Sequence, residues 1–315
     1  MRKLFAILVL SPWAALAAAG YELAGTIEPA AVASVAIYGA TAPYFNSTHS
    51  DSSGHFMFRG LTPGTYTVAV DQGARGEARQ TVEVGPGTAN KQRVQVAMVT
   101  RNVTGNIELG RVLRNGGTVS AKTLAIPPEA WSKYAAAQRA LAKPDVAAAI
   151  RNLQDAVARA PQFMAAWNEL GTIAYHEARY ADAEANFRRA LEAEPDAFEP
   201  LVNLGGVLLN LARPAEALEY NRQAVARRPN DALSNSQLGM AELATGDAEA
   251  ALQHLETAKR IDPAHFSHPQ LLLAQIHLQR GERAEAKAEL EDFVNRHPDA
   301  PETPKIHDAI AQMKP

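Results

Sequence analysis

The chain of 315 residues contains no cysteine, so it has no disulfide framework and no cysteine that could carry a lipid anchor. Stability from packing alone is compatible with an exported bacterial protein. Lysine and arginine total 31 against 34 acidic residues, and the formal net charge is −3. Because there is no basic excess, the composition argues against nucleic acid or anionic lipid as a partner.

Catalytic motifs are also missing. There is no Gly-x-x-x-x-Gly-Lys phosphate loop and no Gly-x-Ser-x-Gly nucleophile elbow. His176-Glu177 does not begin a His-Glu-x-x-His zinc motif, because Tyr180 stands where the second histidine would be. His265 and His268 are close in sequence but flank a turn, with no cysteine or carboxylate triad beside them. We therefore predict a non-enzymatic protein with no catalytic residue, no metal and no cofactor.

The first 19 residues have the layout of a secretory signal peptide. Arg2 and Lys3 precede the apolar run 4–10, and small residues provide cleavage points after Ala17 or Ala19. The run is shorter than the roughly 20 residues of a spanning helix, which argues against an uncleaved anchor. We expect a periplasmic or secreted protein with no transmembrane helix after cleavage.

Residues 20–109 carry a β pattern in which apolar side chains alternate with polar ones. Turn signals such as Thr62-Pro63-Gly64 and Gly85-Pro86-Gly87 separate short runs at about ten-residue spacing, which predicts a β-sandwich. The alternating residues are Val35 and Ile37, Phe56 and Phe58, Tyr66, Val68 and Val70, Val82 and Val84, and Val94 and Val96.

One segment of this region is more specific. The run 50–70, SDSSGHFMFRGLTPGTYTVAV, resembles the carboxypeptidase regulatory-like domain family through its Asp, Gly, Phe and Pro-Gly positions. The resemblance implies a transthyretin-like sandwich. It implies no peptidase, since the zinc motif of such enzymes is missing.

A repeat dominates the second half. Pro161, Pro195, Pro229, Pro263 and Pro298 are spaced by 34, 34, 34 and 35 residues. A fixed period of this length indicates stacked helical units, and each proline would end the second helix of its unit. The five predicted units are 130–163, 164–197, 198–231, 232–265 and 267–300, preceded by a linker at 110–129 and followed by a capping helix within 301–315.

Small residues recur at equivalent positions of the helices in successive units. Gly171, Gly205 and Gly239 share one position of the first helix, and Ala183, Ala217 and Ala251 share one position of the second. Glycine inside a helix costs about 1 kcal/mol relative to alanine, so its recurrence predicts that the two helices cross closely. Polar Asn221 stands in the third unit where Phe187 stands in the second.

This pattern resembles the tetratricopeptide repeat family. The resemblance is carried by Trp167, Leu170, Gly171, Ala183, Phe187, Ala190 and Pro195 and by their echoes in the following units. The predicted fold class is therefore multidomain: an all-β, transthyretin-like sandwich followed by an all-α tetratricopeptide repeat solenoid.

The resemblance implies a function in binding protein or peptide partners, because the first helices of such a solenoid line a concave groove. Few basic residues lie on those helices, which argues against a ligand held by its terminal carboxylate. The predicted groove is apolar and amide-lined, suited to an extended peptide. Its residues are Asn168, Thr172, Tyr175, His176, Val202, Gly206, Leu209, Asn210, Ser236, Met240, Leu243, Leu271 and Gln275.

Two alternatives remain open. In the first, the sandwich binds an envelope glycan or anchors the protein, using Tyr38, Tyr44 and Phe45 as aromatic platforms. In the second, the solenoid assembles with copies of itself. The sequence leaves the oligomeric state and the identity of the partner undetermined.

Overall fold

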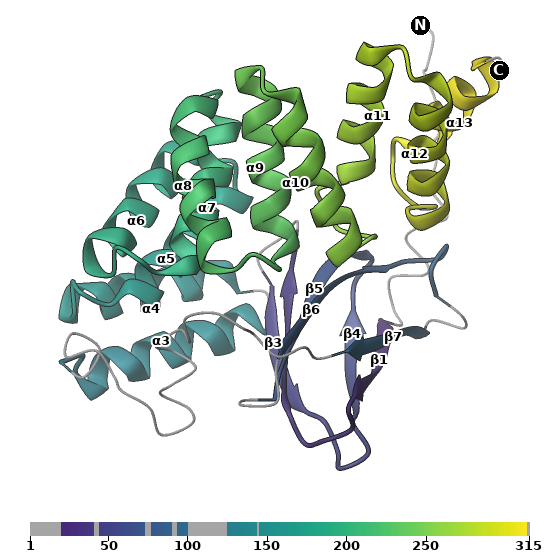
Figure 1. Cartoon of the computed structure of the whole chain (residues 1–315). Helices are drawn as coiled ribbons and strands as arrows, with labels where there is room; N and C mark the ends of the chain where they lie inside the picture. The colour runs from purple at the N-terminus through teal and green to yellow at the C-terminus, as the bar shows by residue number, and fades with distance from the viewer. Residues whose placement is uncertain are drawn as a thin grey trace, which may run out of the picture.

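The computed structural model describes residues 20–40, 44–72, 77–89, 93–99, 125–143 and 145–313. The predicted signal peptide and most of the predicted linker lie outside the described residues. Within the described part, a two-sheet β domain is followed by a row of paired helices (Figure 1). The fold class expected from the sequence is confirmed.

The β domain is a sandwich. In its described part, one sheet has the strand order β4-β1-β7 and the other has the order β3-β2-β5-β6. β1 runs antiparallel to β4 and parallel to β7, whereas the second sheet is antiparallel throughout. The strands are β1 (Tyr21–Glu28), β2 (Ser34–Gly39), β3 (Phe45–His49), β4 (His55–Leu61), β5 (Gly64–Asp71), β6 (Glu77–Val84) and β7 (Arg93–Val99).

Alternation places one side of most strands in the core, as expected for a half-buried sheet. The edge strand β3 is the exception, because none of its residues is buried. The predicted alternating residues in β2, β4, β5, β6 and β7 are all buried. β1 and β3 were not predicted from the sequence. In β1 the apolar alternation is interrupted at Gly25, because a Cβ there would lie 2.0 Å from the ring of Phe56.

The helices form antiparallel pairs. They are α3 (Pro128–Leu141), α4 (Val146–Arg159), α5 (Met164–His176), α6 (Tyr180–Ala193), α7 (Phe198–Asn210), α8 (Pro214–Arg227), α9 (Ala232–Thr245), α10 (Ala248–Ile261), α11 (Pro269–Arg280), α12 (Arg283–Arg296) and α13 (Thr303–Gln312). α4, α6, α8, α10 and α12 each end two residues before a repeat proline, as predicted. α13 is a helix inside the segment predicted to cap the repeats, and it packs against α12. Among the described helices, none is long and apolar enough to cross a membrane.

The predicted close crossing is confirmed in the three helix pairs whose first helix carries the recurrent glycine. A Cβ added to Gly171 would lie 2.5 Å from the ring of Phe187, and one added to Gly239 would lie 2.7 Å from Leu255 Cγ. The same position in the third pair brings Gly205 against Asn221. Each glycine therefore makes room for one side chain of the partner helix.

The sandwich packs against the row of inter-helix turns that contain the repeat prolines. Figure 1 shows α3 beside β3 and the lower end of α10 close to β6. On β6, Val82 and Val84 enter the sandwich core, and the alternate residues point outward. These outward residues meet the solenoid, so the two domains share an interface that the sequence did not predict.

Candidate functional site

The predicted groove residues lie on the first helices of four repeats, α5, α7, α9 and α11, and this face is the candidate site. Of the predicted groove residues, Asn210 and Gln275 are exposed, and Val202, Gly206 and Ser236 are buried. The rest are half-buried, namely Asn168, Thr172, Tyr175, His176, Leu209, Met240, Leu243 and Leu271. A ligand can therefore contact most of the predicted groove, but not the three buried residues. Leu278 on α11 adds an apolar side chain that is 46% exposed.

Hydrogen bonds join the polar groove residues of neighbouring repeats. Asn203 Nδ2 donates to Asn168 Oδ1 at 3.0 Å, and Asn210 Nδ2 donates to the Tyr175 hydroxyl at 3.0 Å. Asn210 Nδ2 also donates to the carbonyl of Gly206. These bonds fix the amide planes relative to α5 and α7, so the polar part of the groove is held in place before any ligand arrives.

Burial in the groove shifts the titration of its polar side chains. Burial lowers the pKa of His176 below its ordinary value, so the imidazole is neutral at pH 7. Burial also raises the pKa of Tyr175, against the effect of its bond from Asn210. The pKa of Glu169, beside Asn168 on α5, is raised to about 7 by burial. The groove is therefore weakly charged, in line with its apolar and amide character.

Sequence reasoning missed two polar residues of this surface. Asn203 bonds to Asn168 across the repeat boundary. Burial, and secondly the charge of Glu169, raises the pKa of the half-buried Tyr134 of the first repeat. Asn203 directly follows Val202, and Glu169 directly follows Asn168. Val202 and Asn168 were both predicted to line the groove. Treating two adjacent helical positions as groove-lining, instead of one, would have included Asn203 and Glu169.

The sandwich covers one rim of the solenoid. Arg79 Nη2 lies 3.6 Å from Glu199 Oε1 at the start of α7, and Glu199 also pairs with Arg228 at 3.3 Å. At the other edge of the sheet, Phe45 packs against the buried cluster of the first repeat, which includes Phe163. Part of the rim beside the first helices is thus already occupied by the chain's own β domain.

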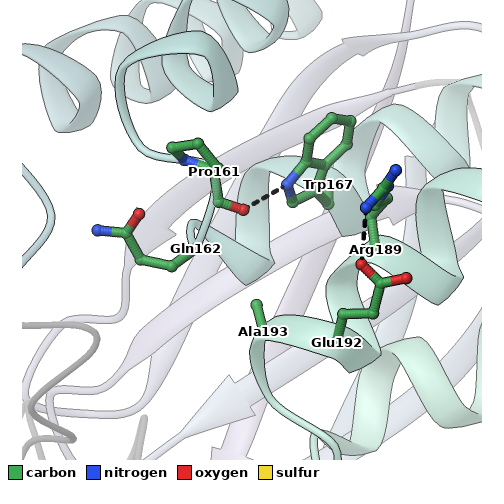
Figure 2. A pocket seen from close by; sticks show the side chains of 6 residues that line it. All are labelled: Pro161, Gln162, Trp167, Arg189, Glu192 and Ala193. Atoms are coloured by element: carbon green, nitrogen blue, oxygen red, sulfur yellow. Dashed lines mark hydrogen bonds and ion pairs between the residues drawn. The ribbon is translucent and has the colours of Figure 1, made fainter.

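A shallow hollow of about 440 Å³ lies at the junction of the first two repeats (Figure 2). Its residues are Pro161, Gln162, Trp167, Arg189, Glu192 and Ala193. The Trp167 indole donates to the carbonyl of Pro161 at 2.9 Å, and Arg189 pairs with Glu192 at 2.9 Å. None of these residues belongs to the predicted groove. Gln162 donates to the carbonyl of Ala125 at 3.3 Å. Because these polar side chains already have partners, the hollow is explained as part of the repeat junction.

The histidines do not assemble a metal centre in the part of the chain described here. No group of three or more His, Cys, Asp or Glu side chains is arranged there to hold an ion. His265 and His268, considered from the sequence as a pair, instead lie near His297, and His265 Nδ1 lies 2.6 Å from the Ser267 hydroxyl.

Known protein families match both the β domain and the helical repeats. The carboxypeptidase regulatory-like domain family matches residues 24–99. Tetratricopeptide repeat families match residues 134–200, 177–232, 202–265 and 242–313. The repeat matches together span more than half of the chain.

Individual similar proteins share the repeats. The chain is 34% identical over 117 residues to the Cell division cycle protein 16 homolog of Homo sapiens, covering 34% of this chain and 19% of that protein. It is 26% identical over 190 residues to Tetratricopeptide repeat protein 21B of Xenopus laevis, covering 57% of this chain and 14% of that protein. The chain thus spans about a fifth or less of the length of these curated relatives.

Among solved structures, PilW, described as a widely conserved type IV pilus biogenesis factor, superposes with a TM-score of 0.53 at 22% identity. The match covers 59% of this chain and 86% of PilW, and it concerns the fold. The same family assignment follows from the helix pairs, the recurrent glycines, the repeat prolines and the family matches. The chain belongs to the tetratricopeptide repeat family and carries a carboxypeptidase regulatory-like domain ahead of its repeats.

Proposed function

We propose that the protein is a non-enzymatic, exported adaptor that holds an extended peptide segment of a partner protein in the concave groove. The observation that carries this proposal is a face on which hydrogen bonds between neighbouring repeats hold the side-chain amides of Asn168 and Asn210. The apolar side chains of the same face are half-buried or, at Leu278, exposed. Asn210 and Tyr175 supply oriented polar groups, and Leu278 supplies an accessible apolar contact. Backbone amides of an extended peptide need such polar partners, while its side chains need apolar pockets.

The alternative in which the sandwich binds a glycan is less well supported. Sugar sites need exposed aromatic faces. Phe45 packs against the first repeat, and Tyr44 packs edge-on against Tyr66 with ring centroids 5.6 Å apart. Tyr38 is 43% exposed, but its ring lies 5.2 Å from that of Phe45, at the edge of the domain interface. The three side chains therefore do not form a shared open platform.

Loss of groove contacts is expected to weaken peptide binding without unfolding the protein. Peptides would be selected from a random display library on the full chain, then measured by fluorescence anisotropy. The variant Asn210→Ala with Leu278→Ser should bind them about 10- to 100-fold more weakly, since it removes a hydrogen bond and an apolar contact. Arg222→Ala, an exposed change on α8, should bind like the parent. If both variants bound the peptides with the same affinity and had unchanged thermal midpoints, the hypothesis that the groove binds peptides would be rejected.

The first residue of the mature protein tests whether the protein is exported. The basic start followed by an apolar run and small residues supports removal of the leader by a signal peptidase. In a bacterial host, the mature protein is expected to begin after Ala17 or Ala19, as read by intact mass in the periplasmic or secreted fraction. A cytoplasmic protein that retains residues 1–19 would contradict export while leaving the groove proposal standing.

A further inference from the structure

The sandwich reaches both ends of the helix row through the two edges of one sheet. In the described strand order β3-β2-β5-β6, β3 and β6 are the edge strands. On β3, Phe45 packs against the buried cluster of the first repeat. The strands from β3 to β6 are joined by antiparallel pairing throughout. The sheet is thus a hydrogen-bonded bridge between the first repeat and the repeats that β6 contacts.

Outward residues of β6 contact two successive repeats. Arg79 pairs with Glu199 at the start of the third repeat. Two residues further on, the Thr81 backbone N–H donates at 2.8 Å to Oδ2 of Asp262, which is buried at the end of α10 in the fourth repeat. An edge strand leaves such outward N–H groups without a partner in its own sheet, and here the solenoid supplies one. These contacts fix the register of the strand along the helix row.

The fifth repeat is held at two points. Glu83 Oε1 lies 2.9 Å from Nδ1 of the buried His297. In the turn after β6, the Gly87 N–H donates to Asp299 Oδ2 at 2.7 Å. A Cβ added to Gly87 would lie 2.5 Å from this oxygen, and one added to Gly85 would lie 3.1 Å from it. The Gly-Pro-Gly segment, predicted from the sequence as a turn, therefore also forms a close-fitting cradle for the Asp299 carboxylate.

A repeat solenoid has contacts only between neighbouring repeats, so its repeats can open one after another from the ends. The last repeat of this chain, α11 and α12, packs on α10 at one side and on the short helix α13 at the other. The sandwich adds contacts that join repeats which are not neighbours. Opening of the fifth repeat while the sandwich stays docked therefore also breaks the contacts with Glu83 and Gly87.

We propose that the docked sandwich is a splint for the solenoid: it joins the first repeat to the third, fourth and fifth, so that the last repeat opens with the rest of the row and not on its own. The two edges of one sheet carry this role, β3 at the first repeat and β6 at the later ones. The splint acts at the rim of the solenoid, so it holds whether or not the groove binds a peptide.

Hydrogen exchange of the full-length protein, followed by mass spectrometry on peptic peptides, tests the splint. In the parent chain, the backbone amides of α11 and α12 should have the same opening constants as those of α9 and α10, although they lie one repeat closer to the end of the row. A steady loss of protection from α9 to α12 would overturn the proposal, because a solenoid without a splint opens in this way.

Two variants break the same contact from opposite sides. Asp299→Ala removes the carboxylate from the cradle, and Gly87→Ala fills the cradle. Each should raise the opening constants of α11 and α12 about tenfold more than those of α3 and α4, because a hydrogen bond to a charged group is lost at the fifth repeat. The double variant should open no more than either single variant. No rise, or an equal rise in all four helices, would contradict the splint.

Arg59→Ala is the matched control. Arg59 is exposed on β4 and pairs with Glu22 inside the sandwich, so its loss removes a surface ion pair without touching the solenoid. All helices of this variant should exchange like those of the parent. Should Gly87→Ala distort the sandwich itself, Asp299→Ala decides, because Asp299 is an exposed residue of the solenoid and its removal leaves the sandwich sequence intact.

Discussion

Gly171→Ala is expected to lower the free energy of unfolding by about 1–3 kcal/mol, although the same change stabilises most helices. The added methyl group would lie 2.5 Å from Phe187 Cε1 and 2.6 Å from Cδ1. Phe187 is fully buried in the core between α5, α6 and α7, so its ring cannot turn away without disturbing neighbours. The result would appear as a lower midpoint in urea unfolding.

A matched control separates this crowding from helix propensity. Gly206 lies on α7, and a methyl group there would meet the amide end of Gln237, a flexible side chain, at 2.6 Å. Gly206→Ala should therefore leave stability unchanged or raise it by up to about 1 kcal/mol. Equal effects at Gly171 and Gly206 would show that the close crossing does not explain the recurrent glycine.

Asn221→Leu is expected to raise the free energy of unfolding by about 1–3 kcal/mol. Asn221 has no exposed surface, and neither its Nδ2 nor its Oδ1 has a hydrogen-bond partner among the described residues. The fourth repeat carries Leu255 at the same position, packed over Gly239 as Asn221 is packed over Gly205. Leucine would thus replace two unsatisfied polar groups with an apolar group already used by the fold.

A second buried asparagine provides the control. Asn235 Nδ2 donates to the carbonyls of Pro229 and Asp231, at 2.9 and 2.8 Å. Asn235→Leu leaves those acceptors without this donor and should lower stability by about 1–3 kcal/mol. Thermal unfolding of the two variants should shift in opposite directions. A loss of stability in Asn221→Leu would mean that its amide groups are satisfied, for instance by ordered water.

Local sequence patterns were sufficient to predict most of the architecture. The spacing of the repeat prolines located the ends of the second helices, since a proline cannot continue the backbone ladder. The in-phase glycines predicted the close helix crossings. In the sandwich, alternation revealed strands whose buried side is uniformly apolar, but it missed β1, where Gly25 makes space for Phe56, and β3, where Phe45 packs on the solenoid.

The sequence by itself determined the class of each domain, because helical and strand periods and turn residues are local properties that each segment carries alone. Only the tertiary structure decided which groove residues are accessible, since the exposure of Asn210 and the burial of Ser236 depend on neighbouring repeats. It also decided that β6 docks on the turns that contain the repeat prolines. Thr81 and Asp262 are 181 residues apart, and no local pattern records so distant a contact.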